Sequence, residues 1–173
     1  MKKKTLIIII LSFPITLTIY ILLFAGNIKF EENIIINSNI DTVARVLNNP
    51  ENKTNYIDEI KEYKLISGEI GSNGSNSEIK INTEGNSILL NEKIIHNKLP
   101  NEIKISLKAD GVYNVYTQKL KSISKDKTKL TTIQEFSFSG YMKFTSFFIE
   151  SILKEQTRSE MMNIKKYIES NYK

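Results

Sequence analysis

The chain of 173 residues is long enough for one membrane segment and one domain of common size. Hydrophobic residues make up 40% and charged residues 25%, which excludes an intrinsically disordered chain. Of the 24 basic residues, 3 lie in the N-terminal tail: Lys2, Lys3 and Lys4. The other 21 nearly balance the 19 acidic residues, so no nucleic-acid partner is expected. With no cysteine and a single histidine, His96, the sequence predicts no disulfide, metal site or cofactor.

Residues 5–25 form an uncharged stretch of 21 residues dominated by Ile and Leu. At ~1.5 Å per helical residue, such a stretch matches a hydrocarbon core of about 30 Å. The alternatives are a cleaved secretory signal and a buried helix of a soluble protein. The length of the run and the large Phe24 at the would-be cleavage site argue against cleavage. We therefore expect an uncleaved transmembrane helix at 5–25.

The orientation of this single-pass anchor follows from the charges beside it. Lysines fill the tail at 1–4, whereas the acidic pair Glu31 and Glu32 follows the span. The positive-inside rule then predicts a cytoplasmic tail and an extracytoplasmic domain at 27–173.

The domain is expected to begin with a strand at 27–37, where apolar residues nearly alternate. The N-cap cluster at 37–39 predicts a short helix that ends at Asn48-Asn49-Pro50. A second short helix is expected near 56–60, followed by a strand at 63–67.

From 77 to 138 the sequence alternates with period two between recurring turn signals, which is typical of antiparallel strands. The clearest strand is 103–109, and Asp110-Gly111 after it predicts a hairpin. The further expected strands are 79–83, 87–97, 112–123 and 130–138. Beyond Gly140 the apolar spacing changes to three and four, which predicts one long amphipathic helix at about 144–172. An antiparallel sheet with one wet face needs a cover, and this helix can provide it.

This order of elements resembles the START-like superfamily, also called SRPBCC or polyketide cyclase/dehydratase-like, over about residues 28–173. The segments that carry the resemblance are 38–43, 47–50, 92–95, 99–100 and 134–140. The resemblance implies an α+β helix-grip fold, in which a curved antiparallel sheet of about six to seven strands wraps around the C-terminal helix. It also implies a cavity, but no particular reaction. The chain departs from the family in having no Trp, and Tyr56 lies nearest the usual place.

Several polar residues share strand parity with apolar neighbours and so are candidates for a ligand pocket. Glu92 and His96 lie on the side of Ile94, unless they only solvate a wet edge. The aromatic stripe after Gly140 is interpreted as core packing or, alternatively, as part of the pocket. The predicted ligand-binding residues are Glu92, His96, Asn114, Tyr116, Gln134, Phe136, Phe144, Phe148 and Ile152.

Three functions remain open at this point. The first is a membrane-anchored module that binds a hydrophobic or amphipathic small molecule, such as a lipid. The second is a cyclase/dehydratase-like or hydrolase-like enzyme that uses Glu92 and His96. The third is an extracytoplasmic protein-interaction domain with a solid core. A cavity above ~300 Å³ would favour the first over the third.

Overall fold

The computed structural model describes residue 16 and residues 26–83 and 86–172. The predicted tail at 1–4 and, apart from residue 16, the predicted span at 5–25 lie outside this part of the chain. Among the described residues, no helix combines the length and the apolar character that a membrane crossing requires.

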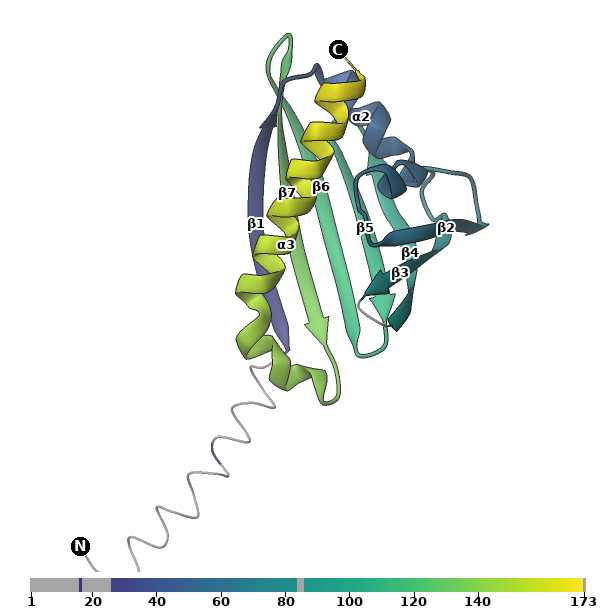
Figure 1. Ribbon diagram of the computed structural model, residues 1–173, viewed down its shortest axis with the longest axis vertical. Helices are drawn as coiled ribbons and strands as arrows, with labels where there is room; N and C mark the ends of the chain where they lie inside the picture. The colour runs from purple at the N-terminus through teal and green to yellow at the C-terminus, as the bar shows by residue number, and fades with distance from the viewer. Residues whose placement is uncertain (1–15, 17–25, 84–85, 173) are drawn as a thin grey trace, which may run out of the picture.

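Within the described residues, seven antiparallel strands form one sheet in the order β1-β7-β6-β5-β4-β3-β2. The chain order is a strand, two short helices, six strands and a long helix, as the sequence predicted. Figure 1 shows α3 lying along one face of the sheet, and β2 and β3 running nearly across the direction of β1 and β7. The predicted α+β architecture is thus confirmed. The elements are β1 (Asn27–Ile36), α2 (Ile40–Asn48), η1 (Pro50–Asn55), β2 (Ile60–Ser67), β3 (Asn76–Thr83), β4 (Asn86–Lys98), β5 (Glu102–Ala109), β6 (Val112–Ser124), β7 (Lys127–Phe138) and α3 (Met142–Asn171).

The region between α2 and β2 differs from the prediction. The α2 helix starts as expected, because Asn39 Oδ1 accepts a hydrogen bond from the Thr42 amide at 2.8 Å. The next helix, however, is a 3₁₀ turn at Pro50–Asn55 and not a helix at 56–60. Proline fits the first turn of a helix because its missing N–H needs no partner there. The predicted helix at 56–60 is therefore wrong, and β2 already begins at Ile60.

The hairpin at Asp110-Gly111 is confirmed between β5 and β6. Gly111 has a φ of +73°, and a Cβ built on it would lie 2.8 Å from Met142 Cγ at the start of α3. Both the backbone angle and the close approach of the helix require glycine at this position.

Two apolar clusters hold α3 to the sheet, one toward each end of the helix. One joins α2 and the C-terminal half of α3 to the sheet, and it includes Leu47, Met161 and Ile168. The other contains Phe30 and Phe138, with Leu153 packed against it. Leu47, Met161 and Leu153 also line a cavity, which therefore lies between the two clusters.

Candidate functional site

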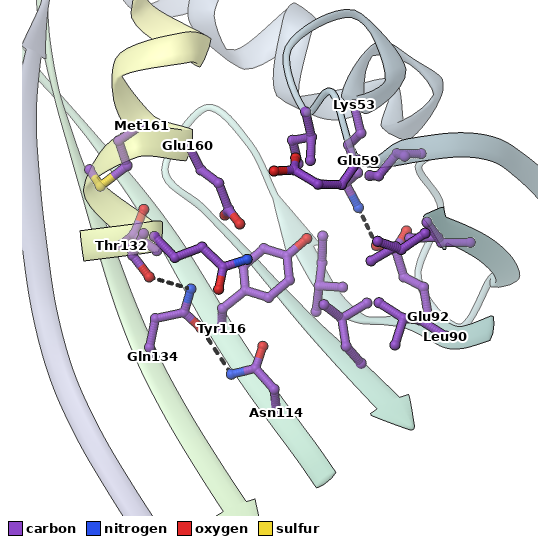
Figure 2. A pocket seen from close by; sticks show the side chains of 18 of the residues that line it. Lys53, Glu59, Leu90, Glu92, Asn114, Tyr116, Thr132, Gln134, Glu160 and Met161 are labelled. Atoms are coloured by element: carbon purple, nitrogen blue, oxygen red, sulfur yellow. Dashed lines mark hydrogen bonds and ion pairs between the residues drawn. The ribbon is translucent and has the colours of Figure 1, made fainter. Parts of the chain in front are cut away.

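A cavity of about 350 Å³ lies between the sheet and α3. Figure 2 shows side chains from the sheet, the helix and the η1 region pointing into it. The largest group of lining residues is aliphatic and comes mainly from β2 to β5 and from α3. These are Leu47, Ile57, Ile60, Ile79, Ile81, Ile88, Leu90, Ile105, Leu107, Leu153, Met161 and Ile164. The volume lies within the range of small-molecule sites and above the ~300 Å³ that distinguishes binding from a solid core.

A buried ion pair forms part of the wall. Lys53 of η1 donates to Glu92 Oε2 on β4, and the two residues are only 8% and 2% exposed. Lys53 Nζ also lies 5.9 Å from the centre of the Tyr116 ring, a distance suited to a cation–π interaction. The second carboxylate oxygen of Glu92, Oε1, has no hydrogen-bond partner among the described residues. Buried ions are tolerated only when they are paired, so Lys53 is what keeps Glu92 in this apolar wall.

A chain of amide hydrogen bonds crosses the floor of the cavity. Asn114 Nδ2 donates to Gln134 Oε1 at 2.9 Å, and Gln134 Nε2 donates to Thr157 Oγ1 on α3 at 3.4 Å (Figure 2). Asn114 and Gln134 meet because they are diagonal neighbours on β6 and β7, where Tyr116 is directly opposite Gln134. Thr132, two residues before Gln134, has a buried hydroxyl that finds no hydrogen-bond partner within residues 26–83 and 86–172. The floor of the cavity thus combines polar groups that are hydrogen-bonded to each other with the Thr132 hydroxyl, which is not.

Two tyrosines of the lining remain protonated at any physiological pH. Burial raises the pKa of Tyr116 well above its ordinary value, and the negative charges of Glu92 and Glu160 add to this effect. Burial likewise raises the pKa of Tyr56, against the opposing effect of Lys53. Both phenols therefore stay neutral and can offer an O–H donor to the cavity.

Two carboxylates face the cavity from opposite sides, Glu160 on α3 and Glu59 just before β2 (Figure 2). Burial raises the pKa of Glu160 to about 7, and the charge of Glu59 adds to the effect, while Lys53 and a hydrogen bond from Gln156 oppose it. Glu160 is thus an acid whose charge changes near neutral pH.

Five of the predicted binding residues line the cavity: Glu92, Asn114, Tyr116, Gln134 and Phe136. The sheet brings them together because alternate residues of neighbouring strands share one face. Their role in binding stays a prediction, since the structure shows their position and not a ligand.

The structure does not bring His96 into this group. A register shift in β4 between Ile94 and His96 breaks the alternation on which its predicted orientation depended. His96 instead lies at the strand end, with Nε2 3.6 Å from Glu102 Oε1.

Phe144, Phe148 and Ile152 also lie outside the cavity. They are exposed on the outer surface of α3, whereas Ser146 and Thr157 are buried on the opposite side of the helix. The interpretation of the aromatic stripe as core packing is therefore wrong.

Other lining residues escaped the sequence analysis, notably Lys53, Tyr56, Glu59 and Glu160. Lys53 has no local signal, because a lysine in a polar turn normally faces water. Glu160 does have a local signal in the sequence, because it lies between Thr157 and Ile164 on a helix face that is otherwise buried. Gln156 of α3 lines the cavity as well.

No family model and no curated protein matches this chain. Solved structures do share its fold. It superimposes on the Zhui aromatase/cyclase of Streptomyces sp. R1128 with a TM-score of 0.73 and 9% identity, over 85% of this chain and 96% of that one. A START superfamily protein of Mycobacterium smegmatis gives a TM-score of 0.71 at 11% identity, over 82% and 97%.

Norcoclaurine synthase of Thalictrum flavum, solved with dopamine and hydroxybenzaldehyde, gives a TM-score of 0.65 at 14% identity, over 86% of this chain and 90% of that one. These neighbours are START/SRPBCC-type proteins, so the chain has the START-like helix-grip fold that its sequence predicted. At such low identity the likeness establishes the fold alone. Proteins of this fold commonly bind hydrophobic small molecules.

Proposed function

We propose that this protein is a membrane-tethered binding module that holds a hydrophobic or amphipathic small molecule between its sheet and α3. The observation that carries the proposal is the cavity itself: about 350 Å³, with aliphatic walls and a few convergent polar groups. Ligand sites combine these two features, because apolar walls supply affinity and a few polar groups fix orientation.

The fold supports the same proposal. Two neighbours are an aromatase/cyclase and a synthase solved with two small aromatic molecules. Catalysis is a weaker candidate for this chain, since the Glu92 and His96 pair on which it depended does not converge in the cavity. Binding therefore accounts for the lining better than the enzymatic alternative does.

The tether belongs to the proposal because of the sequence. The uncharged residues 5–25 directly precede the described domain, and a lysine tail precedes them. A segment of this length and composition is typical of a single-pass anchor. The anchor would keep the binding domain at a membrane, where apolar molecules concentrate.

The test follows the cavity isoleucines by methyl NMR in the full chain, held in phosphatidylcholine nanodiscs. Ile79 and Ile105 are buried and line the cavity. We expect 1-hexanol to shift both methyl signals. Leu107→Trp should abolish these shifts by filling the cavity, whereas Leu89→Trp, on the other side of the sheet, should preserve them. Absent shifts in the wild type, or unchanged shifts in Leu107→Trp, would contradict the proposal.

A further inference from the structure

The charges of the cavity lining are unequal. Among the described residues that line it, Glu59, Glu92 and Glu160 are acidic and only Lys53 is basic. Lys53 is already paired with Glu92. No salt bridge joins Glu59 or Glu160 to any described lysine or arginine, although the charge of Lys53 still acts on Glu160. Two carboxylates therefore face the cavity without a paired cation.

Two buried oxygens in the wall point to the same need. Glu92 Oε1 and Thr132 Oγ1 are shielded from water and have no hydrogen-bond partner in the part of the chain that the structure describes, and their residues are 2% and 3% exposed. A carboxylate can only accept hydrogen bonds. Buried acceptors without donors are rare and costly, so Glu92 Oε1 favours a molecule that donates, whereas the Thr132 hydroxyl can either donate or accept.

The surroundings of Glu160 favour a positive charge. Glu59, Lys53, Tyr56 and Tyr116 are the titratable groups coupled to it from the other elements. Burial and Glu59 both raise the pKa of Glu160, which means that its negative charge is held at a cost. A cation placed between Glu160 and Glu59 would remove this cost and lower that pKa. An anion in the same place would add to the repulsion.

We propose that the ligand of this cavity is an amphipathic organic cation, with its apolar part along the aliphatic wall and an ammonium group between Glu160 and Glu59. The inference rests on the proposed function and adds the chemical class of the ligand. Charge-assisted N–H to carboxylate hydrogen bonds are about twice as strong as neutral ones, which gives the site its preference.

The experiment compares hexylamine, 1-hexanol and hexanoate, which share one alkyl chain, by titrating the same methyl signals at pH 8. We expect hexylamine to bind about tenfold more tightly than 1-hexanol, and hexanoate more weakly than either. Glu160→Gln should remove most of the preference for the amine, measured as the ratio of hexylamine affinity to 1-hexanol affinity in the same variant. The matched control is Glu155→Gln, because Glu155 is exposed on the same helix.

The outcomes separate the two proposals. Equal binding of the alcohol and the amine, tighter binding of hexanoate, or a preference that survives Glu160→Gln would overturn the cationic ligand and leave the binding function intact. If none of the three compounds shifts the signals, the binding function fails as well.

A different surface carries a second inference. Five large apolar side chains lie together on the outer side of α3, and we name them the aromatic face: Tyr141, Phe144, Phe147, Phe148 and Ile152. Tyr141 and Phe148 are 77% and 79% exposed. Soluble surfaces rarely gather so much apolar area unless something binds there.

The position of the chain identifies what covers this face. Gly26 directly follows residues 5–25, and its amide donates to Ser146 Oγ at 3.0 Å, in the first turns of α3. Figure 1 shows the start of β1 and the start of α3 at the same end of the domain. If residues 5–25 span a bilayer, this end is held at its surface.

We infer that the aromatic face rests in the interfacial layer of the membrane that the proposed tether enters. Aromatic side chains are enriched at that depth, because their rings suit the boundary between headgroups and acyl chains. The tether and the face together would fix the orientation of the cavity relative to the bilayer.

Because the chain has no native Trp, a single introduced one reports its own surroundings. Phe148→Trp in the full chain, reconstituted in vesicles that contain acyl-brominated phosphatidylcholine, should lose fluorescence relative to vesicles of unbrominated lipid. Ile123→Trp is the control, because Ile123 is exposed near the C-terminal end of β6, at the end of the domain opposite the aromatic face. Its fluorescence should not change with bromination. The inference would be overturned if bromination left the fluorescence of Phe148→Trp unchanged. This is also the result expected if a second copy of the chain covers the aromatic face.

Discussion

Glu160→Gln tests the electrostatics of the cavity independently of any ligand. The folded protein raises the pKa of this carboxyl from 4.5 to about 7, mainly by burial and then through Glu59. A tenfold change in an acid dissociation constant corresponds to ~1.4 kcal/mol, so ionised Glu160 destabilises the fold by up to about 3 kcal/mol. Water that reaches Glu160 through the cavity reduces the effect, and we expect about 1–3 kcal/mol.

The sign follows from the two protonation states. Below pH 4.5 the carboxyl is neutral in both the folded and the unfolded chain, and the penalty is absent. Between 4.5 and about 7 the unfolded chain ionises first, so the penalty grows with pH and is complete above 7. Glutamine has nearly the same shape and no charge. The substitution should therefore raise the free energy of unfolding at pH 8 and leave it unchanged at pH 4.

Urea unfolding of the full chain in detergent micelles, followed by circular dichroism at both pH values, measures this difference. The control Glu155→Gln should change stability by less than about 0.5 kcal/mol at either pH, because surface substitutions usually do. A gain of equal size at pH 4 and pH 8, or no gain at pH 8, would refute the argument from burial and Glu59.

Three further predictions concern the ion pair, the hairpin and the topology. Lys53→Met should lower the free energy of unfolding by about 3–5 kcal/mol, because Glu92 loses the lysine that is paired with it. Adding Glu92→Leu should recover most of the loss, and a double variant less stable than the single one would be inconsistent with this reasoning. Gly111→Ala should lower the melting temperature more than Gly140→Ala does, because φ is positive at both glycines but only Gly111 is crowded by α3. Equal decreases in melting temperature would count against the close approach of α3 to Gly111. Lys125 is exposed in the β6–β7 hairpin, and the chain has no native cysteine. If the domain lies outside the cytoplasm, Lys125→Cys should react with an impermeant maleimide in intact cells. Labelling only after lysis would instead place the domain in the cytoplasm.

The sequence predicted the elements well where local pattern and tertiary structure agree. In β5, Ile103 and Ile105 are buried, as their spacing indicated, although Ser106 next to them is buried too. The α2 cap at Asn39 is equally local. Each of these features depends on residues close in the chain, so no long-range information was needed.

The errors arise where one residue or one rotation changes the outcome. A single register shift in β4 was enough to separate His96 from Glu92. In α3, the helical period defines two stripes, one through Phe144 and Phe148 and one through Ile149 and Leu153, but it does not say which stripe meets the sheet. The stripe that packs against the sheet is the less aromatic one, in which Ile149 and Leu153 are partly buried.

The remaining site residues could not be predicted, because they meet only in the folded chain. Lys53 and Glu92 are 39 residues apart in the sequence. Glu59 and Glu160 come from opposite sides of the cavity, and neither has a local pattern that requires the other. Their convergence depends on how the sheet curves and where α3 crosses it.

The most direct test of ligand binding is native mass spectrometry of the full chain, purified from cells under mild conditions and released from detergent micelles. We predict a mass above that of the bare chain, which corresponds to a retained small molecule. Leu107→Trp should lose the added mass, and Leu89→Trp should keep it, which separates a cavity ligand from lipids bound elsewhere on the chain. Only the bare mass in the wild type, or the same added mass in Leu107→Trp, would contradict a ligand-binding cavity.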